Sequence, residues 1–252
     1  MIDLHCHFLP ALDDGASDFA EAVGMLELAA ADGVTKVVAT PHLYWQHDGA
    51  GQELQAQTCF GRFVQELKET RRSDQNALPK LELGGENSLT PGFLEAVAQG
   101  RCRSLGGSKW VLVETTPMLP LSALLQAADW LKQQDLRILW AHPERCFALH
   151  RDLTVAQLAV ENGIRLQVTA GSLLGEWGQS AQRAAQGLLA LGCVHVLASD
   201  GHDMKARKPI LSEGVARAAN LMRDKQKAQI LVEDNPAAVL EGREVENFSS
   251  SV

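Results

Sequence analysis

The sequence lacks the marks of a secreted or membrane-bound protein. Its first residues carry neither the basic segment nor the long apolar run of a signal peptide, and no later stretch is apolar enough to span a bilayer. The five cysteines are odd in number and show no CxxC spacing, which fits free thiols in a reducing compartment. We therefore expect a cytoplasmic protein that does not insert into membranes.

Further absences disfavour two functions, a cysteine-dependent phosphatase and a nucleic-acid-binding protein. No cysteine has an arginine six positions later, so the thiolate-plus-arginine loop of cysteine-dependent phosphatases is missing. The chain also has no basic excess: its formal net charge of -8 argues against a nucleic-acid partner held through phosphate contacts. An acidic protein that binds phosphate needs local positive charge, and metal ions can supply it.

No linker, internal repeat or low-complexity segment divides the 252 residues. One (β/α) barrel needs a similar length, roughly 250 residues, so we expect a single domain over 1–252 with a poorly packed tail from about residue 243. Short β-type runs alternate with helical patterns, which is typical of a parallel sheet. The expected strands are 2–5, 35–40, 80–86, 110–115, 137–142, 165–170 and 195–200. The clearest helices are 19–33 and 121–134.

Six of these seven strands end in residue types that bind metals. They are His5 and His7, His42, Glu86, Glu114, His142, and Asp200 with His202. The carboxyl ends of the strands in a parallel barrel meet at one face, so these side chains are predicted to share one pocket. The remaining histidines fall outside this pattern and are expected on the surface or in the core. They are His47, His150 and His195.

The pattern predicts a multinuclear metal site. The alternation of a strand sends His5 and His7 to one face and Cys6 to the other. Imidazoles suit Zn, Mn, Fe or Ni, and a set this large exceeds what one ion needs, so two or three ions are expected. Such a cluster can bind phosphate and activate a water molecule. Arg145 and Arg207 lie beside expected ligands, and their forked guanidinium groups match phosphate oxygens.

Seven segments together resemble the polymerase-and-histidinol-phosphatase (PHP) superfamily. They are DLHCHFLPALDDGA, ATPH, GGENSLT, LVETT, AHPER, QVTAGSLLG and ASDGHD. Within that superfamily they are most similar to the manganese-dependent protein-tyrosine phosphatases of bacterial capsule and exopolysaccharide operons. The similarity runs from Ile2 to about Asn235, and the combination is specific although each motif alone is weak.

The resemblance implies a distorted (β/α)7 TIM-like barrel with three divalent ions, with Mn as the expected metal and Fe, Zn or Mg as the other candidates. The first ion would be held by His5, His7, Glu86 and Asp200. Glu86 would bridge to a second ion completed by Glu114 and His142, and the third would be held by Asp14, His42 and His202. Spacing does not separate Asp13 from Asp14, and that choice comes from the resemblance.

The resemblance also implies the reaction and its partner. Arg145 and Arg207 match the family's phosphate-gripping arginines. The implied substrate is the phosphorylated tyrosine-rich tail of a bacterial tyrosine kinase that regulates polysaccharide export, hydrolysed by metal-activated water without a cysteinyl intermediate. The segment around Tyr44 and Trp45 departs from this pattern; these rings can stack on a phenyl ring or simply pack over the barrel mouth. Lys205 and Lys208 can attract an acidic peptide or form a solvated loop.

Other functions stay open at this point. A small-molecule phosphatase of the same superfamily, acting on histidinol phosphate or a nucleotide, would use the same metals. An amidohydrolase also begins with an HxH strand, but such enzymes commonly bridge their metals with a modified lysine where this chain has Glu86 and Glu114. A non-catalytic protein would use the metals to close the barrel or to form a partner-binding face. The oligomeric state is not indicated.

Overall fold

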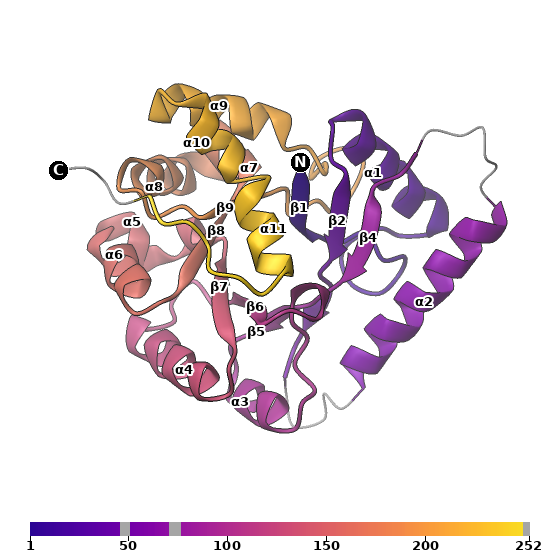
Figure 1. Cartoon of the computed structure of the whole chain (residues 1–252), viewed down its shortest axis with the longest axis horizontal. Helices are drawn as coiled ribbons and strands as arrows, with labels where there is room; N and C mark the ends of the chain where they lie inside the picture. Colours follow the sequence, from indigo (N-terminus) through magenta and orange to yellow (C-terminus); the bar gives the residue numbers. More distant parts are fainter. Residues whose placement is uncertain (46–50, 71–76, 249–252) are drawn as a thin grey trace.

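The structure is a computed structural model that describes residues 1–45, 51–70 and 77–248. Figure 1 shows the strands in the middle of the molecule and the helices around them. The strands are β1 (Ile2–Cys6), β2 (Lys36–Ala39), β3 (His42–Leu43), β4 (Lys80–Leu83), β5 (Glu86–Ser88), β6 (Trp110–Glu114), β7 (Arg137–Ala141), β8 (Arg165–Thr169) and β9 (Val196–Ala198).

The helices alternate with these strands along the chain. They are α1 (Phe19–Ala31), α2 (Gln52–Thr70), α3 (Pro91–Ala98), α4 (Leu121–Gln133), α5 (Phe147–Arg151), α6 (Thr154–Glu161), α7 (Ala170–Leu174), α8 (Gly178–Ala190), α9 (Ser212–Met222), α10 (Lys225–Ile230) and α11 (Asp234–Leu240). Two 3-10 turns are η1 (Leu105–Gly107) and η2 (Pro143–Arg145). The predicted helices 19–33 and 121–134 correspond to α1 and α4.

The parallel strands follow one another around a barrel. One sheet has the order β1-β2-β4 and the other the order β3-β5-β6-β7-β8-β9. Along the chain, β3 follows β2 after a two-residue break, and β5 follows β4 in the same way. A bridge between Cys6 and Gly201 joins β1 to the segment after β9. Within the described residues, the strands therefore occupy seven barrel positions, and the predicted distorted (β/α)7 barrel is confirmed.

The two interrupted strands have local causes in the sequence. Pro41, between β2 and β3, has no backbone N–H to donate to a sheet. At Gly85, between β4 and β5, a Cβ atom would lie 2.5 Å from Cδ1 of Leu43, so a larger residue would force the leucine side chain to shift. Beyond the breaks, His42 and Glu86 pair in register. The interruptions thus bring two predicted ligands side by side.

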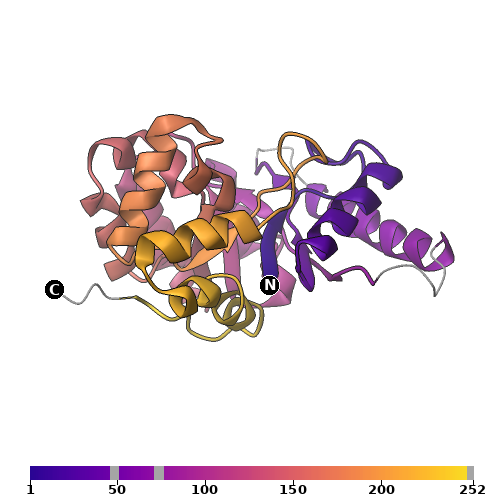
Figure 2. The same ribbon diagram turned by 90° about the horizontal axis from the view of Figure 1, so that it is seen from above.

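The core consists of two apolar layers. The larger layer lies between the strands and the outer helices and includes Phe63 of α2 and Leu188 of α8. The smaller layer includes Leu112 of β6, two residues before Glu114, and therefore lies on the strand face that carries the ligands. Figure 2 shows helices α1 and α2 (indigo and purple) on one side of β1 and the orange helices on the other.

The tail differs from the sequence-based expectation of poor packing after residue 243. Val245 and Phe248 are both buried. The indole N–H of Trp110 donates to the carbonyl of Arg243 at 3.0 Å, and Asn235 accepts from the N–H of Glu246 at 3.0 Å. The segment up to residue 248 is therefore fixed by contacts with β6 and α11. None of the helices in the described part of the chain is both long and apolar enough to cross a membrane.

Candidate metal centre

The first group of ligand atoms comes from β1 and the residue after it, from the first residue of β5, and from the segment after β9. The Nε2 atoms of His5 and His7 are 3.1 Å apart. Nε2 of His5 lies 3.4 Å from Oε2 of Glu86 and 3.3 Å from Oδ1 of Asp200. Cys6 packs with the larger apolar layer, so the two histidines share a side that the cysteine does not. Both histidines thus lie near each of the two carboxylates predicted to share the first ion.

A second group surrounds the other oxygen of Glu86. Nε2 of His142 lies 2.7 Å from Oε1 of Glu86 and 4.0 Å from Oε1 of Glu114. The hydroxyl of Ser88 donates to Oε2 of Glu114 at 3.2 Å and orients that carboxylate. Because the two oxygens of Glu86 face different sets of histidines, this residue lies between the first and second groups.

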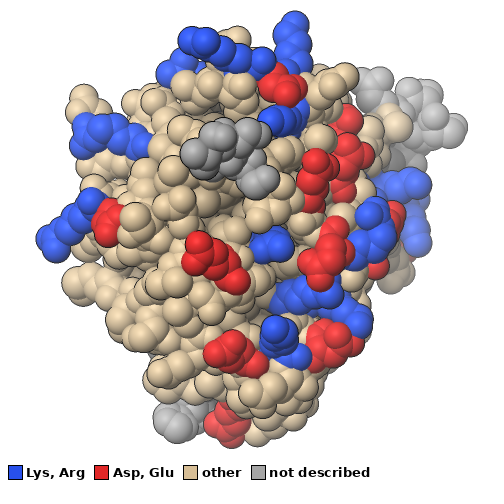
Figure 3. All heavy atoms as spheres, turned by 60° about the vertical axis from the view of Figure 1, so that its left-hand side comes forward, with Lys and Arg blue, Asp and Glu red and all other residues tan. Residues whose placement is uncertain are grey.

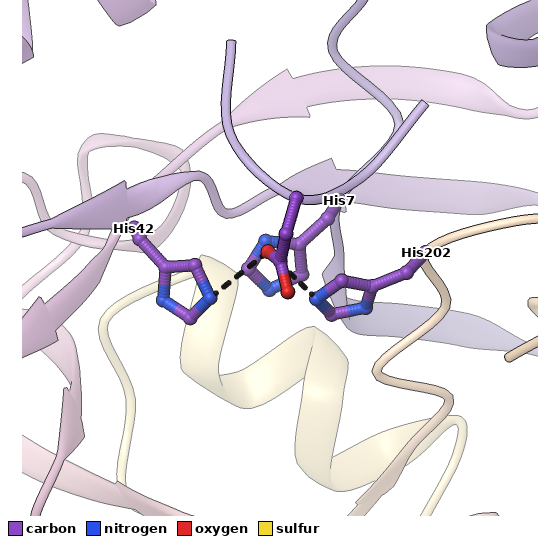
Figure 4. Close-up of side chains that lie close together, drawn as sticks. His7, His42 and His202 are labelled. Carbon is purple, nitrogen blue, oxygen red and sulfur yellow. Dashed lines mark ion pairs between the residues drawn. The ribbon is translucent and has the colours of Figure 1, made fainter. Parts of the chain in front are cut away.

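The third group is drawn in Figure 4, where His42 and His202 lie on either side of a carboxylate. Oδ1 of Asp14 is 3.2 Å from Nε2 of His42 and 3.3 Å from Nε2 of His202, and dashed lines in the figure mark these pairs. Asp13 lies behind His7 instead and accepts from its Nδ1 at 2.8 Å. The structure therefore places Asp14, rather than Asp13, among the converging atoms.

These donors fit divalent cations. Sets of three or four His, Asp and Glu ligand atoms lie within 4.8 Å of one another in four overlapping groups, which contain all nine predicted ligands. Among the described residues, Oε2 of Glu86 is buried and accepts no well-formed hydrogen bond, although Nδ1 of His42 lies 2.9 Å away. Burying carboxylates without a counter-charge costs several kcal/mol each, about what a bound cation would offset. The buried, unpaired oxygen of Glu86 among imidazole nitrogens therefore fits a bound cation.

The pKa shifts in the cluster agree with the need for a bound cation. Burial alone would lower the pKa of His7, but the hydrogen bond to Asp13 and the nearby Glu86 carboxylate raise it to about 10. Burial and the nearby His7 lower the pKa of His202 to about 4, so His202 is neutral near pH 7. Although burial opposes it, the charges of His5 and Arg145 hold the pKa of Asp200 well below its usual range. The Asp200 carboxylate is therefore ionised and attracts positive charge.

Two supporting residues were not identified from the sequence. Nδ1 of His5 lies 2.8 Å from Oε1 of Gln167 on β8. Asp13 holds His7 in the same way. Such partners fix the tautomer and the direction of a metal-binding imidazole. The alternation on β8 places Gln167 on the inward face, but nothing in the sequence pairs it with His5.

The backbone is strained at two of the ligands. His142 has φ 33° and Asp200 has φ 54°, which is the left-handed region that side chains with a Cβ rarely adopt. Each such residue costs about 1–3 kcal/mol and persists only where the surrounding structure holds it. At the ends of β7 and β9, this turn of the chain directs the side chains toward the cluster.

The two predicted arginines meet at Asp200. Nη2 of Arg145 lies 2.5 Å and Nη2 of Arg207 lies 3.0 Å from Oδ2 of Asp200. Arg145 also donates to Oγ1 of Thr169 at 3.0 Å. The other oxygen of Asp200 faces the histidines. One carboxylate therefore connects the candidate metal cluster to both arginines.

The remaining candidates divide between surface, core and rim. Trp45 is buried and donates to Oδ1 of Asn87 at 3.3 Å, which is a packing role. Tyr44 is 45% exposed and stacks on the ring of His42 with centroids 5.4 Å apart. His150 is exposed and His195 is buried in the core, as expected. Lys205 and Lys208 are exposed. His47 lies outside the described residues.

The described cysteines do not form a nucleophilic site. All five are free thiols. Burial raises the pKa of Cys102 to about 12 and raises the pKa of Cys146 as well. A thiolate, rather than a thiol, is the attacking species in cysteine chemistry. The side chains at this site therefore favour metal-assisted chemistry over covalent catalysis.

The family model for capsular polysaccharide synthesis, CpsB/CapC, matches residues 1–241. The chain belongs to the CpsB/CapC family. Two similar proteins are named tyrosine-protein phosphatases. The tyrosine-protein phosphatase YwqE of Bacillus subtilis is 30% identical over 217 residues, covering 82% of this chain and 79% of the relative. The tyrosine-protein phosphatase CpsB of Streptococcus pneumoniae is 23% identical over 247 residues, covering 95% of this chain and 98% of the relative.

Solved structures show the same fold. A crystal structure from a study of YwqE and CpsB, described there as unique metal-dependent tyrosine phosphatases, has a TM-score of 0.87 at 24% identity and covers 98% of this chain and 97% of that chain. A TatD-family hydrolase from Entamoeba histolytica has a TM-score of 0.57 at 10% identity, covering 95% of this chain and 97% of that chain. The latter likeness shows a shared TIM-like barrel, whereas membership of the CpsB/CapC family decides against the amidohydrolase alternative.

Proposed function

We propose that this chain is a metal-dependent protein-tyrosine phosphatase of the CpsB/CapC family that acts in capsular or exopolysaccharide synthesis. The observation that carries the proposal is the carboxylate of Asp200. It faces His5 through one oxygen and both Arg145 and Arg207 through the other. A phosphate monoester needs this combination, because its charge must be met by cations on one side and by hydrogen-bond donors on the other.

The proposed cofactors are three divalent cations, with Mn as the expected metal and Fe, Zn or Mg as the other candidates. The four overlapping ligand groups around Glu86 and Asp14 support a site for more than one ion. The mixed nitrogen and oxygen donors suit Mn, Fe or Zn, whereas Mg prefers a purely oxygen environment. When bound, such ions would lower the pKa of a water molecule and offset the charge of the phosphate.

The chain itself orients the ester. The guanidinium groups of Arg145 and Arg207 can each present two N–H donors to phosphate oxygens. Nε of each arginine is buried and has no hydrogen-bond acceptor among the described residues. Gln167 and Asp13 hold His5 and His7 in place. Hydrolysis by water requires no thiolate, which agrees with the raised pKa of the Cys146 thiol.

The proposed partner is the phosphotyrosine-bearing tail of a bacterial tyrosine kinase. Membership in a family of capsular polysaccharide synthesis supports this, and relatives carry the name tyrosine-protein phosphatase. A nucleic-acid partner is not supported by the charge pattern, because acidic and basic side chains are interspersed on the face in Figure 3.

Substrate preference is the direct test. We expect a phosphotyrosine peptide to be hydrolysed with a higher kcat/KM than histidinol phosphate or nucleoside monophosphates under the same conditions. A strong preference for one of these small metabolites would replace the proposal with a small-molecule phosphatase.

Metal dependence is tested separately with p-nitrophenyl phosphate. Activity should survive thiol alkylation, disappear with a chelator and return with Mn²⁺. Metal analysis of protein purified without chelator should find three ions per chain. Persistent inactivity with all metals bound would instead favour a non-catalytic scaffold.

A further inference from the structure

One aromatic residue near the candidate metal centre has no role in the function proposed so far. Trp177 follows α7 and precedes α8, and it is 37% exposed. The guanidinium carbon of Arg145 lies 3.5 Å from the centre of its ring, and that of Arg207 lies 4.9 Å away. The same ring is therefore in contact with both arginines that meet at Asp200.

The turn that carries Trp177 contains two glycines in the left-handed region. Gly175 and Gly178 flank it with φ of 94° and 83°, values that favour glycine. Trp177 also lines a hollow of about 420 Å³ together with Asp200 and Arg207. The ring thus stands at the wall of a cavity that opens beside the cluster, and the backbone on both sides is specified by sequence.

Stacking on a neutral ring has a chemical advantage at this site. Two guanidinium groups that meet on Asp200 repel each other, and Nη1 of Arg207 also lies 3.5 Å from Oδ2 of Asp14. Holding both groups by more carboxylates would add ion pairs that compete with phosphate. A ring face attracts the guanidinium group through its quadrupole and contacts its flat side. The N–H edges stay available for an anion, and the neutral ring adds no negative charge that would repel it.

We propose that Trp177 is a positioning residue that holds Arg145 and Arg207 with their N–H edges toward the phosphate of the substrate. The proposal rests on the proposed phosphatase function for its substrate, but its physical content is the binding of a phosphate group. The ring would act by holding the two arginines and would not itself contact the reacting atoms.

The first experiment measures inorganic phosphate binding by calorimetry to metal-loaded protein, together with phosphate inhibition of p-nitrophenyl phosphate hydrolysis. Trp177→Leu should weaken phosphate binding about tenfold, the effect of losing two cation–π contacts, whereas Trp177→Phe should stay within about threefold of the wild type. Trp130→Leu, an equivalent change on helix α4, should leave phosphate binding unchanged. Metal content and melting temperature are recorded for each variant.

A double-mutant comparison separates the mechanism from general damage. If the ring acts through the arginines, Trp177→Leu should have less than a twofold further effect on phosphate binding in an Arg145→Ala/Arg207→Ala background. The same tenfold loss in that background would overturn the proposal, and so would full phosphate affinity in Trp177→Leu. Equal losses in the Phe and Leu variants would also overturn it, because a ring face is retained in only one of them.

The result can be told apart from a failure of the proposed function. Wild-type protein that binds phosphate but hydrolyses no phosphotyrosine peptide would refute the phosphatase while leaving the binding test of Trp177 intact. Conversely, if the wild type is an active phosphatase and Trp177→Leu binds phosphate as tightly as the wild type, only the role of the ring is refuted. If Trp177→Leu loses metal, the Phe variant carries the test, and a tenfold loss there with metals retained counts against the proposal.

Discussion

Asp13 accepts a hydrogen bond from Nδ1 of His7 at 2.8 Å. This contact turns the other ring nitrogen of His7 toward Glu86 and Asp200, at 3.4 and 3.7 Å. Despite burial, the bond to His7 holds the pKa of Asp13 at about 2, so Asp13 stays ionised. The acidic residue that precedes Asp14 therefore works behind the metal centre, whereas its neighbour points into it.

Removing the charge of Asp13 should weaken metal binding without unfolding the protein. Partners of metal-binding histidines typically contribute about 10–100-fold in metal affinity. We expect Asp13→Asn to lower the affinity for Mn²⁺ by at least about tenfold, measured by competition with a chelator of known affinity. Asp129→Asn, an exposed carboxylate on α4, is the matched control. Unchanged affinity in Asp13→Asn would contradict the orienting role.

Glu86 should matter for more than one ion, because its two oxygens face different histidines. Oε1 lies near His142, and Oε2 lies near His5 and His42. We expect Glu86→Gln to lower the number of metal ions per chain by more than one, as measured by elemental analysis. Glu114→Gln touches a single group and should have a smaller effect. Equal losses in the two variants would argue against a bridging position.

Arg145→Ala should slow catalysis while the metals stay bound. Losing a donor to developing charge costs about 3 kcal/mol, or about a hundredfold in turnover. The measurement is kcat on a phosphotyrosine peptide, with metal content determined on the same sample. Arg151→Ala removes an exposed arginine on helix α5 and serves as the control. Normal turnover in Arg145→Ala would remove that residue from the mechanism.

Loss of a metal ligand should lower metal occupancy, whereas loss of an arginine should lower turnover with the metals still bound. Nε2 of His142 lies 2.7 Å from Glu86, so we expect His142→Ala to impair metal occupancy first and activity as a consequence. Restoring activity at high Mn²⁺ concentration would support this order of events. A variant that retains every ion yet is inactive would contradict it.

Acid stability should depend on His195, which lies outside the metal centre. Burial and the charge of Arg165 lower the pKa of His195 to about 3, against about 6.5 in an unfolded chain. Between these values the unfolded chain binds more protons, so stability is complete above pH ~6.5 and falls as the pH is lowered. The expected loss at pH 5 is about 2 kcal/mol.

The test of this pH effect compares the wild type with His195→Gln, whose amide oxygen can still accept the N–H of Leu166. Urea unfolding at pH 7.5 and pH 5, at one fixed metal concentration, gives the change in the free energy of unfolding. The variant should lose about 2 kcal/mol less than the wild type over this range. Identical losses would show that His195 does not carry the effect.

Much of the barrel was predictable because each strand is a short β-type run that ends in a recognisable residue. His5, Glu114 and His142 all follow this rule, and parallel strands must bring their carboxyl ends together. The interruptions were not predicted: the expected strand 35–40 ended before Pro41, and the expected strand 80–86 ran through Gly85 without a break. The packing of residues 243–248 also differs from the loosely packed tail expected from the sequence, because contacts such as Trp110 to Arg243 join distant segments.

The sequence alone determined which residue types suited to metal and phosphate follow the strands, because side-chain chemistry and strand periodicity are local properties. It did not determine which partner each of them has. Gln167 meets His5 across 162 positions, and Trp177 meets both arginines. Asp13 and Asp14 differ in role although they are adjacent. Only the closed barrel decides these pairings, because distances between remote segments follow from how the whole chain packs.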